Sequence, residues 1–383
     1  MNQIEVKKKF IEFFKTKPIL VKAPGRINLI GEHTDYNNGY VLPAAINKDI
    51  YLALQKNNKN LIRIFAVNLD ESIEISANKI IKNNADWANY LLGSYSELIK
   101  DGNELQGFDC VFGGDLPIGA GLSSSAAIEC GLIYGLNHLY DLNIDNLHIA
   151  KLAQKAENNF VGVNCGIMDQ YAIMHGKKDN VIQLDCRSLN SSYSPYKLND
   201  YSIVLVNSNV KHSLATSEYN TRRSECDTGV QILQKYLPAI KSLRDVSLDE
   251  IKKYKHYFNS TIYNRCLYII EENERVLKFC TALEKNNDEE IGNLLYSTHL
   301  GLKNQYEVSC IEIDLLVQVA NEMDYVLGSR MMGGGFGGCT LNLVQKNKVE
   351  LFTQTIQEIY TSKIDIKPSF YNVEITNGIE IIN

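Results

Sequence analysis

The sequence predicts an α+β fold with mixed sheets. The first half of the chain alternates extended apolar segments with glycine-rich turns, residues 222 to about 325 have mostly helical patterning, and the tail returns to strands. Successive strand–helix–strand units of the kind that build a parallel sheet are not evident in this pattern, so a Rossmann-type fold is not expected.

Length, charge and composition narrow the class of protein. The chain has 383 residues, of which 45% are hydrophobic and 22% charged, a size that suits two domains. A net charge of −6 without long basic blocks argues against a nucleic-acid partner. No apolar run is long enough to span a bilayer, the N-terminus lacks a signal-peptide pattern, and nine scattered cysteines without a CxxC pair indicate reduced thiols. We therefore expect a cytoplasmic protein with no membrane partner.

The elements of the first half follow from hydrophobic spacing. Residues 4–14 predict an amphipathic helix whose three lysines face solvent. Residues 121–140 begin as a Gly/Ser loop and continue as an apolar stretch whose length favours a buried helix, and residues 148–160 place their apolar side chains on one helix face. Short apolar segments predict strands at 51–55, 61–67, 72–76 and 109–112.

The second half begins at a polar segment. Residues 189–200 are polar and turn-rich and lie between two predicted strands, 181–186 and 201–208. We therefore expect a domain boundary there, which divides the chain into domains 1–190 and 191–383. Two strands are expected in the tail, at 339–344 and 370–375.

The segment 23–36, APGRINLIGEHTDY, follows an apolar run and combines two glycines with Arg26, Glu32, His33 and Asp35. A plain strand does not need those charges, and a surface loop rarely follows so apolar a lead-in. The pattern indicates a ligand that is held by several polar groups at once.

The segment 115–131, DLPIGAGLSSSAAIECG, places a glycine-rich turn and three serines at the start of a helix. Glycines let backbone N–H groups approach a ligand, and the first helical turn leaves N–H donors unpaired, so the segment suits a phosphate. A serine-capped helix after a glycine turn is an equally good interpretation of this segment alone. The spacing differs from a Walker A loop, a protein-kinase loop and a dinucleotide-binding fingerprint.

Two further segments are weaker signals. Five of the six residues from 333 to 338 are glycine, which indicates either a closely approaching ligand, close backbone packing or a tight turn. Glu157, at the edge of an apolar helix face, and Asp169 could serve as a metal ligand and a base. For either acid alone, helix capping by Asp169 or partial solvation of Glu157 is the better interpretation.

The order and spacing of these four segments resemble the GHMP family of small-molecule kinases. Within it, the stretch from Gly25 to Gly39 is similar to the galactokinase signature, and residues 86–93 and 211–223 match galactokinase segments. The resemblance covers nearly the whole chain. It implies two α+β domains with the active site in the cleft between them.

The resemblance also implies roles for individual residues. ATP would place its phosphates on the glycine/serine loop, Mg²⁺ would bind two oxygen donors, and a sugar would be held mainly by the GEHTD segment. The implied phosphate-binding residues are Gly119, Ala120, Gly121, Leu122, Ser123, Ser124 and Ser125, the metal ligands are Ser125 and Glu157, and the sugar-binding residues are Glu32, His33, Thr34, Asp35, Gly166 and Tyr219.

The implied catalytic pair is Arg26 and Asp169. Asp169 would accept the proton of the anomeric hydroxyl as that hydroxyl attacks the γ-phosphate, and Arg26 would hold Asp169 ionised and stabilise the transferring group. We expect positioning and electrostatics to contribute more than proton transfer. The implied reaction is phosphorylation of D-galactose to α-D-galactose 1-phosphate, which is the first step of galactose catabolism by the Leloir pathway. We expect the protein to be a monomer.

Alternatives remain at this stage. A kinase for N-acetylgalactosamine, L-arabinose or galacturonate would carry the same motifs. A sugar sensor without activity is less favoured, because such sensors lack the Ser-Ala pair that stands here as Ser125-Ala126. The chain departs from the family pattern at Asn164, where proline is usual, and at Tyr171, and neither departure is expected to affect activity.

Overall fold

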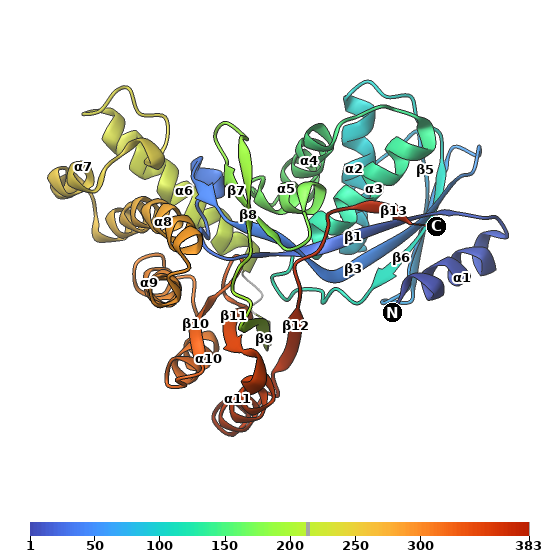
Figure 1. Cartoon of the computed structure of the whole chain (residues 1–383). Coiled ribbons are helices and arrows are strands. Elements are labelled where there is room, and N and C mark those ends of the chain that lie inside the picture. The colour runs from blue at the N-terminus through green and yellow to red at the C-terminus, as the bar shows by residue number, and fades with distance from the viewer. Residues whose placement is uncertain (212–214, 383) are drawn as a thin grey trace.

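The computed structural model describes residues 1–211 and 215–382. Its strands form three sheets, and helices pack around them (Figure 1). The segment 211–223 therefore lies partly outside the described residues.

The N-terminal lobe consists of the elements before residue 196 together with one strand near the C-terminus. Its helices are α1 (Gln3–Phe14), α2 (Asp86–Lys100), α3 (Ser124–Tyr140), α4 (Asn146–Lys155) and α5 (Met168–His175). Its strands are β1 (Ile19–Asn28), β2 (Tyr40–Val41), β3 (Pro43–Lys56), β4 (Leu61–Ala66), β5 (Glu71–Ser76), β6 (Phe108–Gly114), β7 (Asn180–Asp185), β8 (Ser191–Pro195) and β13 (Glu380–Ile382).

The C-terminal lobe is mainly helical around one sheet. Its helices are α6 (Ala215–Gln234), α7 (Leu248–Lys253), α8 (Ser260–Lys285), α9 (Asp288–Asn304), α10 (Ile311–Asn321) and α11 (Val349–Ile364). Its strands are β9 (Tyr201–Lys211), β10 (Val326–Met331), β11 (Gly337–Gln345) and β12 (Ser369–Val373).

The largest sheet has six strands in the order β13-β1-β3-β6-β4-β5. A three-stranded sheet, β2-β7-β8, belongs to the same lobe, and the C-terminal lobe contains the four-stranded sheet β10-β11-β9-β12. Among the strand pairs of the described residues, β4 with β6 is parallel and the others are antiparallel. The predicted α+β fold with mixed sheets is therefore confirmed.

Helix α3 packs closely on the six-stranded sheet. A Cβ atom at Gly131 would lie 2.4 Å from a methyl group of Leu52, and one at Gly135 would lie 2.2 Å from a methyl group of Leu54. Both leucines belong to β3, so the two glycines let the helix axis approach the strand. This packing fixes the N-terminal end of α3 beside the end of β1, where Arg26 lies.

Most predicted elements are present with small shifts of their ends. The helix expected at 148–160 ends as α4 at Lys155 and continues as a π-helical turn over Ala156–Val161. The polar segment 189–200 contains β8, which pairs with β7 before the chain enters the second sheet at β9. The position of a domain boundary within this segment stays a prediction.

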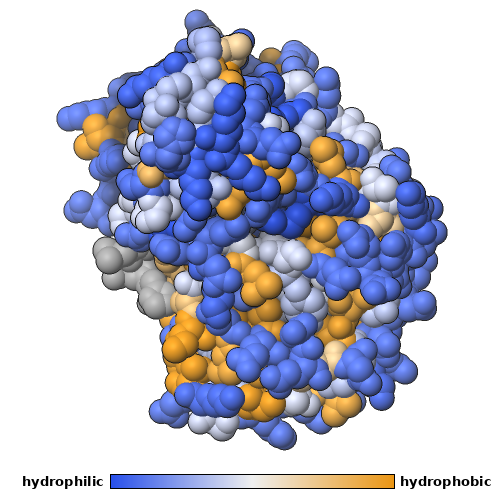
Figure 2. All heavy atoms as spheres, turned by 90° about the vertical axis from the view of Figure 1, so that its left-hand side faces the viewer, coloured by the Kyte–Doolittle hydropathy of each residue, from blue (hydrophilic) through white to orange (hydrophobic). Residues whose placement is uncertain are grey.

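The surface has both polar and apolar regions. Figure 2 shows polar side chains over most of one face and apolar side chains that gather mainly in its lower half. Within the described ranges, no helix is both long and apolar enough to cross a bilayer. Seven of the nine cysteines are buried, as expected for small core residues.

Candidate active site

The glycine-rich segment forms a tight loop that ends at a helix. Gly119 and Gly121 have φ values of 73° and 76°, and Ser123 at 61° also lies in the left-handed region, immediately before α3 begins at Ser124. Glycine adopts this conformation easily, whereas serine does so at a cost. The loop therefore brings its backbone and three serines to the N-terminal end of α3, where unpaired N–H donors and the helix dipole favour an anion.

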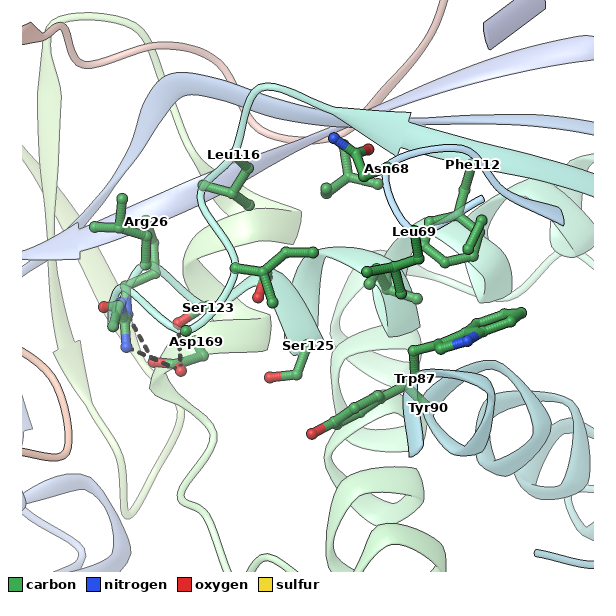
Figure 3. A pocket seen from close by; sticks show the side chains of 18 of the residues that line it. Arg26, Asn68, Leu69, Trp87, Tyr90, Phe112, Leu116, Ser123, Ser125 and Asp169 are labelled. Atoms are coloured by element: carbon green, nitrogen blue, oxygen red, sulfur yellow. Dashed lines mark hydrogen bonds and ion pairs between the residues drawn. The ribbon is translucent and has the colours of Figure 1, made fainter. Parts of the chain in front are cut away.

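Arg26 and Asp169 form a bidentate ion pair beside this loop (Figure 3). Arg26 donates from Nε to Asp169 Oδ1 at 2.7 Å and from Nη2 to Oδ2 at 3.0 Å. Its Nη1 donates to the carbonyl of Gly121 at 2.7 Å, and the Ser123 hydroxyl donates to Asp169 Oδ2 at 2.5 Å. The loop, the arginine and the carboxylate thus form one rigid unit. Burial opposes the charge of Arg26, but the neighbouring carboxylates, Asp169 first, raise its pKa.

The first cavity lies along the glycine-rich loop and has a volume of ≈ 430 Å³. Figure 3 shows Arg26, Ser123 and Asp169 at one end and an aromatic wall at the other. Such a wall can pack on a planar base. The residues of the wall and its surroundings are Asn68, Leu69, Trp87, Tyr90 and Phe112.

The sequence analysis did not assign these residues. Trp87 and Tyr90 lie on α2, and Asn68 and Leu69 follow β4, so they are distant from the loop in the sequence. One signal was available, because Trp87 is the single tryptophan of the chain and lies in the matching segment 86–93.

The second cavity is smaller, ≈ 120 Å³, and adjoins the other side of the ion pair. It is lined mainly by polar residues. Five of the residues that the sequence analysis assigned to a sugar line it together with Arg26 and Asp169: Glu32, His33, Asp35, Gly166 and Tyr219.

Glu32 is 1% exposed and is fixed by a buried network. Its Oε1 accepts hydrogen bonds from Arg330 Nη1 at 3.0 Å and from the Gly333 N–H at 2.9 Å, and its Oε2 accepts one from Asn28 at 3.0 Å. Burial opposes its ionisation, but Arg330 and Arg26 outweigh this effect and lower the pKa of Glu32. Glu32 is therefore an ionised acceptor with a fixed orientation.

Of the two ring nitrogens of His33, one has a hydrogen-bond partner and the other has none among the described residues. Nδ1 lies 2.7 Å from the Tyr36 hydroxyl, whereas Nε2 is buried without a hydrogen-bond partner in the described residues. Burial lowers the pKa of His33 to about 4, so the ring is neutral near pH 7. Because a buried polar atom without a partner is costly, Nε2 is a candidate contact for a hydroxyl of a ligand.

Asp35 packs directly against Gly166. A Cβ atom at Gly166 would lie 2.0 Å from Asp35 Oδ2, so a side chain at this position would displace the carboxylate. Burial, followed by repulsion from Asp169, raises the pKa of Asp35 to about 7. Tyr219, from the C-terminal lobe, stacks at a tilt on the His33 ring with 5.3 Å between the ring centroids.

Two predicted site residues are not among those that line the cavities. The Thr34 hydroxyl is buried within hydrogen-bond distance of two carbonyls, Gly31 at 2.8 Å and Tyr40 at 2.6 Å, so its single proton is used within its own turn. Ala120 is fully buried in the core beneath the loop. Both residues therefore support the backbone of the site and do not line its cavities.

Ser125 and Glu157 present two oxygen donors near the glycine-rich loop. Glu157 is 7% exposed, and its Oε2 accepts hydrogen bonds from Gln170 at 2.9 Å and from the Cys165 thiol at 3.4 Å. Burial, followed by repulsion from Asp169, raises the pKa of Glu157 to about 7. A divalent cation would relieve both effects. Mg²⁺ is commonly held by one or two protein oxygens plus phosphate oxygens, so this pair fits it although the described residues contain no larger metal-ligating cluster.

The segment 333–338 is explained by close packing. Gly333 donates its N–H to Glu32, Gly334 lies against the Tyr219 ring, and a Cβ atom at Gly335 would lie 2.3 Å from the carbonyl oxygen of Val308. The sequence left three interpretations of this segment open, and the contacts confirm close backbone packing.

Models of protein families match three parts of the chain. The galactokinase galactose-binding signature matches residues 8–56, the GHMP kinases N terminal domain matches residues 89–177, and the GHMP kinases C terminal model matches residues 280–360. The range of the signature includes Arg26 and the 32–35 segment, and the range of the N terminal model includes the glycine-rich loop, Glu157 and Asp169.

Curated relatives and solved structures agree with these matches. A galactokinase of Clostridium acetobutylicum is 44% identical over 368 residues, with 94% of each chain covered, and one of Staphylococcus saprophyticus is 41% identical, with 99% of each chain covered. The crystal structure of Lactococcus lactis galactokinase complexed with galactose superimposes with a TM-score of 0.95 at 35% identity, covering 99% of each chain. The mevalonate kinase of Methanococcus jannaschii shares the fold, with a TM-score of 0.65 at 20% identity over 95% of this chain and all of that one.

Proposed function

The chain belongs to the galactokinase family of the GHMP kinases, and we propose that it transfers the γ-phosphoryl group of ATP to the anomeric hydroxyl of D-galactose. The products are α-D-galactose 1-phosphate and ADP, and the reaction is the first step of the Leloir pathway. The family assignment rests on relatives at 41–44% identity over nearly the whole chain. The assignment of individual residues below is our proposal.

One observation carries the assignment of the catalytic pair. Arg26 and Asp169 line both the ≈ 430 Å³ cavity and the ≈ 120 Å³ cavity, so the ion pair lies where the two cavities meet. A phosphoryl group that moves from a nucleotide in the larger cavity to a sugar in the smaller one must pass this point. We therefore place the reacting atoms beside Arg26 and Asp169.

The smaller cavity is proposed to hold the sugar. Ionised Glu32 and the free Nε2 of His33 can pair with hydroxyl groups, and Asp35 can accept a hydrogen bond or, when protonated, donate one. Gly166 leaves room for the carboxylate of Asp35, and Tyr219 provides an apolar ring face. A neutral polyol suits this site because it adds no charge to a cavity that already contains four carboxyl groups.

The larger cavity is proposed to hold ATP. The phosphates would lie on the backbone from Gly119 to Ser125 at the start of α3, and the base would lie among the aromatic residues Trp87, Tyr90 and Phe112. Ser125 and Glu157 would hold Mg²⁺, which neutralises phosphate charge when it is bound.

The ion pair contributes mainly by position and charge. Asp169 is held by Arg26 and Ser123, so it cannot turn away from the anomeric hydroxyl. It would orient that hydroxyl and accept its proton, while Arg26 would stabilise negative charge on the transferring group. Orientation and electrostatic stabilisation are the main contributions in phosphoryl transfer, where little covalent chemistry falls to the protein.

The test is ADP release from MgATP with a panel of sugars. The panel comprises galactose, glucose, talose, N-acetylgalactosamine, L-arabinose and galacturonate. We expect fast turnover with galactose and none with glucose. Turnover with another sugar alone would overturn the substrate while keeping the chemistry, and galactose binding without turnover would replace the kinase by a sensor.

Cellular context and assembly are also proposals. We propose that the active protein is a monomer, which analytical ultracentrifugation tests. ATP as co-substrate and nine free cysteines support a cytoplasmic location. We propose the domains 1–190 and 191–383, with β8 and β13 pairing back onto strands of the first domain. Tyr219 and the 333–334 glycines then reach the site from the second domain.

A further inference from the structure

A short loop of the N-terminal lobe lies at the mouth of the smaller cavity. Residues 162–166 connect the π-helical turn after α4 to the segment that enters α5, and three of them line the cavity: Val163, Cys165 and Gly166. Opposite this loop lies the first part of α6, from the C-terminal lobe, which carries Tyr219 into the same cavity.

Three hydrogen bonds join the loop to α6. The backbone N–H of Asn164 donates to Asn220 Oδ1 at 3.0 Å, and Asn220 Nδ2 donates to the Gly162 carbonyl at 3.3 Å. Arg223 Nη1 donates to the Asn164 carbonyl at 2.8 Å. Asn220 directly follows Tyr219 in the chain, so these bonds act next to a residue that lines the cavity.

We propose that Asn220 and Arg223 form a latch with the 162–166 loop that keeps the sugar cavity closed and slows the release of the sugar. This inference rests on the proposed function for the identity of the sugar. Arg223 also lies near the Tyr36 ring, 5.9 Å from its centroid, and Tyr36 is adjacent to Asp35. The latch therefore joins three parts of the chain: the 162–166 loop, α6 and the segment that carries the proposed polar sugar contacts.

The first of these bonds uses the backbone N–H of Asn164. Proline has no backbone N–H, so it could not donate to Asn220 from this position. The other two bonds use carbonyl groups, which proline keeps. Asn164 thus gives this chain one latch bond more than a chain with proline at this position can make.

The bonds lie at the surface, so their effect is moderate. Exposed hydrogen bonds contribute modestly to stability, which corresponds to roughly a three- to tenfold change in an equilibrium or rate for one bond. Because the latch contacts the sugar side of the site and not the Arg26–Asp169 pair, its loss changes KM and sugar dissociation more than kcat.

The test compares Asn164→Pro with Asn164→Ala. Both variants remove the asparagine side chain, but only proline removes the N–H. We expect the proline variant to raise the KM for galactose and its dissociation rate about three- to tenfold with a kcat within twofold, and the alanine variant to resemble the parent. Equal effects of the two substitutions would overturn the role of the N–H.

A second comparison separates the latch from the rigidity of proline. Asn220→Leu removes two of the three bonds, so adding Asn164→Pro to it should have no further effect on KM. An effect of Asn164→Pro that is as large in the Asn220→Leu background as in the parent would contradict the proposal.

Hydrogen exchange tests the latch without any sugar. The amide of Asn164 should exchange more slowly in the parent than in Asn220→Leu, and more slowly still when galactose is bound. If the parent turns over no galactose but this difference in exchange is present, the proposed function fails and the latch stands. If the exchange rates are the same, the latch fails whatever the substrate.

Discussion

At the scale of single residues, the site contains several acids whose environments give them different tasks. Glu32 is ionised and fixed by Arg330, whereas burial and like charges disfavour ionisation of Asp35 and Glu157. Asp169 has a partner on each oxygen. The carboxylates are therefore not interchangeable, and substitution of each should produce a distinct defect.

Replacing Asp169 with asparagine removes the negative charge and the proton acceptor while keeping the shape. We expect kcat to fall by roughly 10²- to 10⁴-fold, because general acid–base catalysis and charge stabilisation contribute at this scale. Galactose affinity, measured by isothermal titration calorimetry, should stay within a fewfold of the parent. Near-normal turnover would remove Asp169 from the mechanism.

Asp35 should make stability depend on pH. Its pKa in the folded protein is about 7, against an ordinary value of 3.8. Because the folded-state pKa is raised, the contribution of Asp35 to stability is full below about pH 4 and is lost as the pH rises to about 7. Asp35→Asn should abolish this loss and weaken galactose binding.

Urea unfolding of the parent and of Asp35→Asn at pH 4 and pH 8, without ligand, measures this effect. At each pH, the free energy of unfolding of the parent is subtracted from that of the variant. This difference should be larger at pH 8 than at pH 4 by an amount on the order of 2–4 kcal/mol. A difference that is the same at both pH values would show that Asp35 keeps an ordinary pKa.

At the scale of elements, the start of α3 combines strain with function. Ser123 has a φ of 61° although it is not glycine, and its hydroxyl holds Asp169. Strained backbone positions persist where a side chain is needed. The conformation of Ser123 thus lowers the stability of the helix start, but it fixes the position of the Asp169 carboxylate.

Two substitutions of Ser123 separate these contributions. Ser123→Ala and Ser123→Gly both remove the hydroxyl, so both should lower kcat/KM by roughly 10- to 100-fold, the value of a hydrogen bond to a charged group. Glycine also relieves the left-handed conformation, so the glycine variant should be more stable than the alanine variant by about 1 kcal/mol. Steady-state kinetics and urea unfolding measure the two effects. Unequal activities, or greater stability of the alanine variant, would contradict this account.

The sequence predicted most elements because their hydrophobic periodicity is local. It missed β10, although β10 pairs with its sequence neighbour β11, because glycine, serine and arginine interrupt the apolar pattern of Val326–Met331. It also did not predict β13, whose partner β1 lies at the opposite end of the sequence. Similarly, the motifs identified Arg26, Asp169 and the 32–35 segment, but the roles of Arg330 and the α2 aromatic wall appear only when distant segments meet. Thr34 and Ala120 show the opposite case, because motif membership alone does not indicate which way a side chain faces.

At the scale of the whole molecule, Arg330 joins the two lobes. It is fully buried on β10 and donates to the carboxylate of Glu32, to the Leu29 carbonyl at 2.8 Å and to the Asn28 carbonyl. A buried charge of this kind is tolerated only because each of its three nitrogen atoms has a hydrogen-bond partner. The segment from Asn28 to Glu32 is therefore held in place from the opposite lobe.

Replacing Arg330 with methionine leaves Glu32 buried without its partner. We expect the free energy of unfolding to fall by roughly 3–5 kcal/mol, measured in urea, and galactose affinity to fall with it. Adding Glu32→Gln should recover part of the stability, because it removes the unpaired charge, but not the affinity. A loss below about 1 kcal/mol in the single variant would show that this pair does not hold the lobes together.

The strand β13 has a consequence for how the molecule is made. It pairs with β1, and the Lys22–Glu380 ion pair at this junction joins residues 358 positions apart. Because the ribosome synthesises the chain from its N-terminus, it must add 358 residues after Lys22 before this ion pair can form and β1 acquires this neighbour. Until then one edge of β1 stays open to other strands, so nascent chains of this protein should depend on chaperones more than finished ones.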